Sequence, residues 1–97
     1  MQNQYEGATL WRNGWVACQD VTVVAYLPRL CGSRWEGHLV LRHGTPLPVG
    51  ETYTVAIDGV TPFRARITGE ADPEGVVAFD SRSPTPVRTI DMLPPYS

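Results

Sequence analysis

The chain has 97 residues and a mass of 10.7 kDa, which is enough for one domain and too little for a second hydrophobic core. Hydrophobic residues make up 42% and charged residues 19%, a composition typical of a folded protein rather than a disordered one. The formal net charge of -2 lacks the basic excess that nucleic-acid-binding domains usually carry. Nine glycines and nine prolines argue against long helices and favour short strands joined by tight turns.

The N-terminal part of the chain contains Asn13-Gly14 between two apolar stretches. Asn-Gly is the strongest two-residue signal for a β-hairpin, because both central residues of the favoured turn need a positive φ. The turn predicts a ribbon in which Trp11 lies opposite Val16 and Leu10 lies opposite Ala17.

Asp58-Gly59 predicts a second hairpin. A two-residue turn here would put Phe63 on the opposite face of the ribbon from Val55, which splits the apolar set. A three-residue loop with Gly59 in the left-handed region restores the parity. We therefore expect Tyr53 opposite Phe63 and Val55 opposite Thr61.

The segment Asp72-Pro73-Glu74-Gly75 predicts a third hairpin. Pro73 presets the first turn angle, and Gly75 supplies the left-handed residue that follows. The expected pairing brings Ala71 to Val77 and Gly69 to Phe79, where the aromatic ring would cover the bare glycine backbone.

Alternation of side chains completes the strands: every odd position from 21 to 27 is apolar, and Trp35, Leu39 and Leu41 share a face with Gly37. Six strands are expected near 5–12, 15–27, 34–43, 51–57, 60–71 and 76–81. The predicted fold class is all-β, a small six-stranded antiparallel meander forming a closed barrel or compact sandwich. Closure into a barrel would remove exposed strand edges.

The predicted domain covers residues 1–81. Residues 82–97 hold four of the nine prolines, so they are expected to form an extended C-terminal segment, with 87–92 as a candidate edge strand. No apolar run approaches the length that spans a bilayer, and residues 1–4 lack the charge and apolar stretch of a signal peptide. We therefore expect a cytoplasmic protein with reduced thiols and no membrane partner.

Four soft metal ligands, Cys18, Cys31, His38 and His43, fall within one window of 26 residues. They lack the close cysteine pairs of zinc fingers, and pairing of their strands would place Cys18 and His43 far from the other two. The acidic residues from 70 to 74 lack the closing glutamate of a calcium loop. The expectation is no metal and no cofactor.

Catalytic motifs are also missing from the sequence: it contains no Gly-x-Ser-x-Gly, no phosphate-binding glycine loop and no His-Glu-x-x-His. A cysteine nucleophile at Cys31 would need His38 as a nearby base, and a loop cysteine beside Arg34 is usually inert. We therefore expect a protein that is not an enzyme.

The outward face of the second and third predicted strands is apolar where a one-sided sheet should be polar. The candidate interface residues are Val24, Tyr26, His38 and Val40, extended by Trp11, which is expected to share a face with Val16 and Cys18. Either the C-terminal residues Ile90, Met92 and Leu93 or a second copy of the chain would cover this face. The predicted function is a non-enzymatic interaction module that binds itself or another protein, with Tyr26 and Trp11 as anchors.

Two alternatives remain. A small barrel could bind single-stranded nucleic acid by stacking bases on aromatic residues between arginines, although the net negative charge argues against it. The residues for that role are Tyr5, Arg12, Trp15, Arg34 and Trp35. A small ligand could instead bind at a barrel mouth formed by the loops 28–34 and 44–50.

Overall fold

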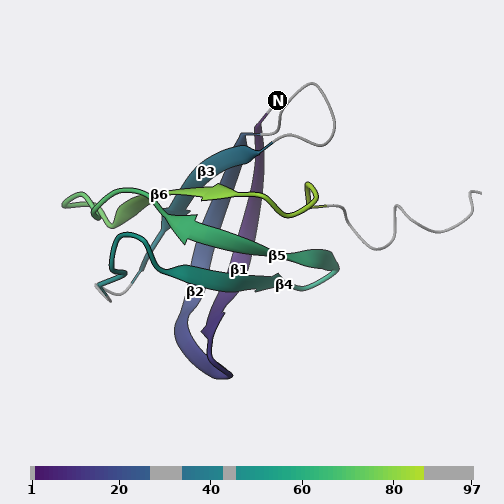
Figure 1. Cartoon of the computed structure of the whole chain (residues 1–97), viewed down its shortest axis with the longest axis horizontal. Helices are drawn as coiled ribbons and strands as arrows, with labels where there is room; N and C mark the ends of the chain where they lie inside the picture. Colours follow the sequence, from purple (N-terminus) through teal and green to yellow (C-terminus); the bar gives the residue numbers. More distant parts are fainter. Residues whose placement is uncertain (1, 27–33, 43–45, 87–97) are drawn as a thin grey trace, which may run out of the picture.

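The computed structural model describes residues 2–26, 34–42 and 46–86. Its strands are β1 (Gln2–Arg12), β2 (Trp15–Tyr26), β3 (Trp35–Val40), β4 (Thr52–Ile57), β5 (Val60–Ile67) and β6 (Val76–Ser81). All pairs are antiparallel, and the sheet closes into a barrel in the order β1-β2-β3-β6-β5-β4 (Figure 1). The predicted all-β class and barrel closure are confirmed. Among the described residues, no helix has the length and apolar character needed to cross a membrane.

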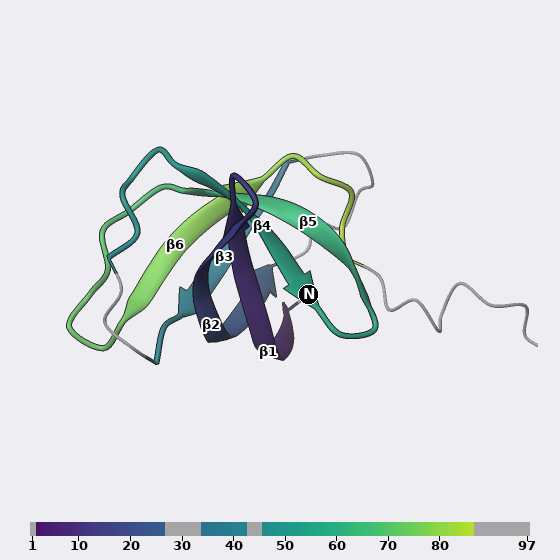
Figure 2. The same ribbon diagram turned by 90° about the horizontal axis from the view of Figure 1, so that it is seen from below.

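The strand order departs from the predicted meander in two pairings. β1-β2-β3 and β4-β5-β6 are each a meander, but β3 pairs with β6 and β4 pairs with β1. In Figures 1 and 2 the strands β4, β5 and β6 run across the strands β1, β2 and β3. The two outer strands of one group can therefore pair with the two outer strands of the other. The β3–β4 connection contains Pro46 and Pro48, which have no N–H for a hairpin ladder, so it carries the chain to a new position instead. The expected edge strand at 87–92 lies outside the described residues.

The first hairpin forms at the predicted turn, with φ of 53° at Asn13 and 79° at Gly14. Trp11 pairs with Val16 as expected, but Leu10 pairs with Cys18 rather than with Ala17. The register shift between Leu10 and Trp11 is a bulge, which places an extra residue on one strand. The bulge turns both Leu10 and Cys18 into the core, where both are buried.

The second hairpin keeps the predicted faces but not the predicted partners. Gly59 is left-handed, at φ 73°, yet the turn is closed by the pair Ile57–Val60. A register shift between the pairs Ile57–Val60 and Val55–Phe63, with the extra residue on β5, then restores the parity. As a result Val55 lies opposite Phe63 and Tyr53 lies opposite Ala65, two residues away from the expected pairing.

The third hairpin has the expected turn chemistry within a wider connection. Asp72 Oδ1 accepts hydrogen bonds from the backbone N–H groups of Glu74 and Val76, both at 2.9 Å, and Gly75 is left-handed at φ 83°. Because β5 ends at Ile67, it is Ile67, not Gly69, that pairs with Phe79. The predicted Gly69–Phe79 pair is therefore wrong, and Ala71 lies in the connection after β5 rather than in a strand.

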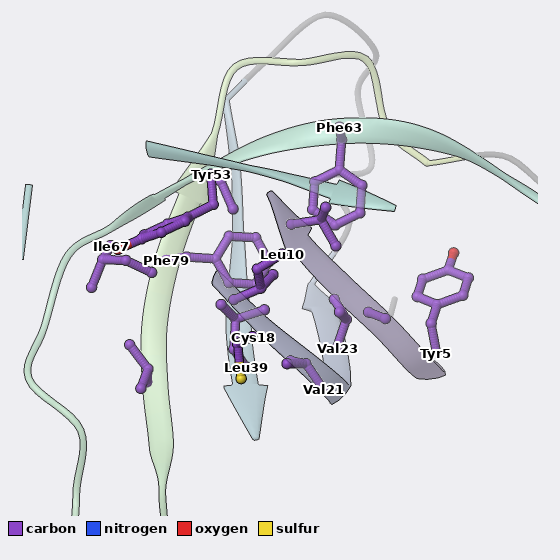
Figure 3. Close-up of a cluster of buried hydrophobic side chains, with 14 of the residues drawn as sticks. Tyr5, Leu10, Cys18, Val21, Val23, Leu39, Tyr53, Phe63, Ile67 and Phe79 are labelled. Atoms are coloured by element: carbon purple, nitrogen blue, oxygen red, sulfur yellow. The ribbon is translucent and has the colours of Figure 1, made fainter. Parts of the chain in front are cut away.

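Apolar side chains from all six strands fill the barrel (Figure 3). The largest fully buried ones include Phe63, Phe79, Leu10 and Leu39. Trp35 packs edge-on against Phe63 and Phe79, with ring centroids 4.9 and 5.6 Å away. Its Nε1–H donates to the carbonyl oxygen of Ser83 at 2.9 Å, so the chain that follows β6 is tied to the core.

Candidate functional site

The outer side of the barrel wall is apolar over three neighbouring strands, β2, β3 and β6. The strand register places Val24, His38 and Ala78 in one row and Thr22, Val40 and Val76 in the next. We call the outward-facing residues Val24, Tyr26, His38, Val40, Val76 and Ala78 the outer sheet face. Four of the five predicted interface residues belong to it. Its two residues from β6 were not predicted, because in a meander β6 would not lie beside β3.

Tyr26 and His38 form a fixed pair on the outer sheet face. Tyr26 Oη and His38 Nδ1 are 3.1 Å apart and share a hydrogen bond, and the rings meet edge to face at 5.3 Å. The Tyr26 side chain remains 39% exposed. An aromatic group held in place loses little conformational entropy when a partner covers it, which suits a binding anchor.

A hollow of about 170 Å³ lies beside this pair, and its lining includes Tyr26, His38, Thr68 and Ala78. It lies where β2, β3 and β6 run side by side. The hollow gives the outer sheet face a shape into which a side chain of a partner could pack.

Charged residues of opposite sign lie at the two ends of the outer sheet face. Glu36 is exposed at one end of β3, and Arg42 is exposed just beyond the other end. At the Arg42 end, Thr22 Oγ1 donates to Glu6 Oε2 at 2.9 Å. The hydrogen bonds from Gln4 and Thr22 lower the pKa of Glu6, burial opposes them, and the charge of Arg42 adds to the lowering.

Trp11 does not belong to the outer sheet face. It pairs with Val16 near the tip of the first hairpin, whereas Gln4, seven residues earlier on β1, pairs with Val24. At about 3.3 Å per residue, Trp11 and Val24 are separated by roughly 20 Å along the ribbon. The hairpin extends beyond β4 in Figure 1 and forms a separate exposed group of Trp11, Trp15 and Val16. Cys18, expected beside Trp11, is instead buried and labelled within the core in Figure 3.

The five residues predicted for base stacking do not form a platform. Tyr5 and Trp35 lie in the core, with exposed fractions of 6% and 2%, so neither ring is available to a base. Trp15 is 78% exposed at the hairpin tip, next to Arg12, which forms an ion pair with Glu51. Arg34 lies beside Asp80 and directly precedes β3. The alternation that placed Trp35 with Leu39 and Leu41 already indicated its inward position.

The soft metal ligands are not brought together in the described part of the chain. Cys18 faces the core, and its thiol lies 3.7 Å from the carbonyl oxygen of Gln19, while His38 lies on the outer sheet face. Cys31 and His43 lie outside the described residues, as do most of the loops 28–34 and 44–50 proposed for a small ligand. Within residues 2–26, 34–42 and 46–86, no group of three potential ligands could hold a metal ion.

Asp80 is the only buried carboxylate among the described residues, and it is held by arginines. Arg66 donates to both of its oxygens, from Nε at 3.2 Å and from Nη2 at 2.9 Å, and Arg34 Nη1 lies 3.7 Å away. The hydrogen bonds from Arg66 lower the pKa of Asp80, burial opposes this effect, and the charges of Arg66, Arg34 and Arg82 reinforce it.

Replacement of Asp80 by asparagine is expected to lower the free energy of unfolding near neutral pH by about 1–2 kcal/mol, since the arginines are solvated and the pair is partly screened. The folded carboxyl has a lowered pKa, so its contribution is complete above about pH 4 and disappears as the pH falls through the folded value. Urea unfolding at several pH values should show the difference shrinking below about pH 4. Asp58→Asn, at an exposed turn, is the control for loss of one charge. A deficit that is constant down to about pH 2 would contradict this account.

Comparison of the chain with protein-family models, with curated proteins and with solved structures finds no significant match.

Proposed function

We propose that the chain is a non-enzymatic interaction module that forms a symmetric dimer by packing the outer sheet faces of two copies together. The supporting observation is the continuity of the apolar surface over β2, β3 and β6 on the solvent side of the barrel wall. A sheet that faced only water there would carry polar residues in place of Val24, Val40 and Val76.

The charges at the ends of the face favour a second copy as the partner. A two-fold axis that lies between the two faces and runs perpendicular to β3 exchanges their ends, so Glu36 of one copy would lie over Arg42 of the other, twice in the dimer. Such pairs set the orientation of the interface more than its affinity. The same axis would bring the two Tyr26–His38 pairs to opposite sides of the interface.

Tyr26→Glu is expected to convert a dimeric wild type into a monomer. An aromatic anchor that the partner covers contributes about 2 kcal/mol or more, and each dimer contains the altered position twice, so the dissociation constant should rise roughly 1,000-fold. Light scattering coupled to size exclusion measures the mass directly. Trp11→Glu, which places the same charge on the separate hairpin group, is the matched control and should remain dimeric.

Reversal of the end charges tests the orientation within the same experiment. Glu36→Arg and Arg42→Glu should each weaken the dimer, and the double variant should recover much of the loss because opposite charges face each other again. A wild type that is monomeric at about 100 μM, where a stable dimer persists, would falsify the proposal. Dissociation by Trp11→Glu and not by Tyr26→Glu would move the interface to the hairpin.

We also propose that the protein is located in the cytoplasm. Cys18 is a free, buried thiol, which suits a reducing compartment, where disulfides are rare.

A further inference from the structure

A depression of about 520 Å³ lies on the outer wall of the barrel over one end of β4, β5 and β6. The register explains its composition: Thr52, Arg66 and Asp80 form one row across the three strands, and Arg64 lies two residues from Arg66 on the same outward side of β5. Arg82 and Ser83, in the segment after β6, complete the rim. This region borders the outer sheet face at its Glu36 end, because Asp80 pairs with Glu36, which pairs with Tyr26.

The depression is strongly basic in a protein whose overall charge is negative. Its lining holds the three guanidinium groups of Arg64, Arg66 and Arg82 against the single carboxylate of Asp80, which leaves a net charge of +2. The whole chain has a formal charge of -2. Within the described residues, neither Arg64 nor Arg82 has a carboxylate within 4.0 Å, so their charges are not neutralised by an ion pair there.

Asp80 fixes the orientation of the Arg66 guanidinium without occupying all of its hydrogen-bond donors. The carboxylate accepts from Nε and Nη2, which form one edge of the guanidinium plane. A guanidinium carries five N–H donors, so the end that includes Nη1 is left for another acceptor. Because the ion pair already fixes the plane of Arg66, less side-chain entropy is lost when an anion binds.

A hydroxyl group is fixed on the rim in the same way. Ser83 Oγ accepts a hydrogen bond from the backbone N–H of Arg64 at 3.0 Å, and the Ser83 carbonyl accepts from Trp35 Nε1 at 2.9 Å. These contacts hold Ser83 against the core. The hydroxyl hydrogen of Ser83 is then directed away from Arg64 N–H and can donate to a ligand.

We propose that this depression binds the diphosphate group of a small ligand. Arginine forks and hydroxyl donors match phosphate oxygens, and arginine binds phosphate through two parallel hydrogen bonds. A single carboxylate would neutralise only half of the net charge of +2, whereas a diphosphate carries at least two negative charges. The volume of about 520 Å³ lies within the range of small-molecule sites.

Calorimetric titration of the full chain with sodium pyrophosphate in about 0.1 M salt tests the proposal. The expected dissociation constant is about 0.1 mM, since the open site leaves the ligand partly hydrated. Arg64→Gln and Arg82→Gln should each weaken binding about 5-fold and together at least 10-fold. Arg42→Gln removes the same charge beyond the far end of β3 and should change binding less than twofold, because charges more than about 10 Å away are screened at 0.1 M salt.

Titration with other anions tests whether the site requires phosphate groups and which kind of molecule carries them. Adenosine diphosphate that binds as tightly as pyrophosphate supports the proposal. If it binds more tightly, the ligand that carries the diphosphate is a nucleotide. Citrate that binds equally well would overturn it, because carboxylates would then suffice. Tight binding of oligothymidylate with weak binding of pyrophosphate would also overturn it, in favour of a nucleic acid.

Two further outcomes contradict the site itself. Pyrophosphate that gives no heat up to about 10 mM rules it out, and so does an Arg42→Gln variant that loses as much affinity as Arg64→Gln. Repetition on Tyr26→Glu separates this inference from the proposed dimer: the diphosphate site lies within one barrel, so a monomeric variant should retain it.

Discussion

Gly37→Ala is expected to cost about 3–5 kcal/mol of unfolding free energy, a large part of the stability of a domain of this size. Gly37 lies in β3 between β2 and β6, opposite Ala25 and Phe79. A Cβ atom there would lie 2.2 Å from the carbonyl oxygen of Val24 and 2.9 Å from Phe79 Cζ. The carbonyl belongs to the backbone of the paired strand, so the clash is relieved only if β2 and β3 separate.

Gly69→Ala is the matched control for this substitution. The nearest atom to a Cβ at Gly69 is the Ala78 side chain at 3.7 Å, an ordinary van der Waals contact. We expect its unfolding free energy to stay within about 0.5 kcal/mol of the wild type. Urea denaturation followed by tryptophan fluorescence measures both variants. If Gly37→Ala loses less than about 1 kcal/mol, the close approach of β2 and β3 at this point is incorrect.

The Phe79 ring also shows how far the sequence predicts the fold. The sequence indicates that this ring covers a glycine, and it does, but the glycine is Gly37 on β3 rather than Gly69. Turn residues and alternation are local signals, and they placed six strands close to their observed positions. Pairing of β3 with β6 depends on contacts between distant parts of the chain, which no turn signal encodes.

Register was predictable only where no bulge intervenes. The Trp11–Val16 pair follows directly from the Asn13-Gly14 turn, whereas one step further the bulge brings Leu10 to Cys18. A bulge forms where its extra residue turns apolar side chains into the core, so its position depends on the packing of the whole barrel. The same reason accounts for the error of two residues at Val55.

The candidate sites were likewise predictable from the sequence only in part. Alternation identified Val24, Tyr26, His38 and Val40 on the outer sheet face, because this signal is present within each strand. Val76 and Ala78 join them only through the β3–β6 pairing. The diphosphate site was missed altogether, although the spacing of Arg64 and Arg66 in a strand already places both on one side. What the sequence did not indicate is that Arg82 lies beside them.

Trp35→Ala is expected to destabilise the barrel by about 3–5 kcal/mol, the usual cost of truncating a buried large aromatic residue. The Trp35 side chain is 2% exposed and contacts both Phe63 and Phe79, so the substitution leaves a cavity in the aromatic part of the core. It also removes the donor to the Ser83 carbonyl. The segment that carries Arg82 and Ser83 would then keep the hydrogen bond from the Arg64 N–H to Ser83 Oγ but lose its bond to the core.

Trp15→Ala is the control with the same change of side chain, since Trp15 is 78% exposed at the hairpin tip and should alter stability by no more than about 0.5 kcal/mol. Trp35→Phe separates packing from hydrogen bonding: it keeps an aromatic ring but no N–H, so its loss should be intermediate, at about 1–3 kcal/mol. Equal effects of Trp35→Ala and Trp15→Ala in denaturant unfolding would place Trp35 on the surface. The ring would then be free for stacking on a base, and the core described for this barrel would be wrong.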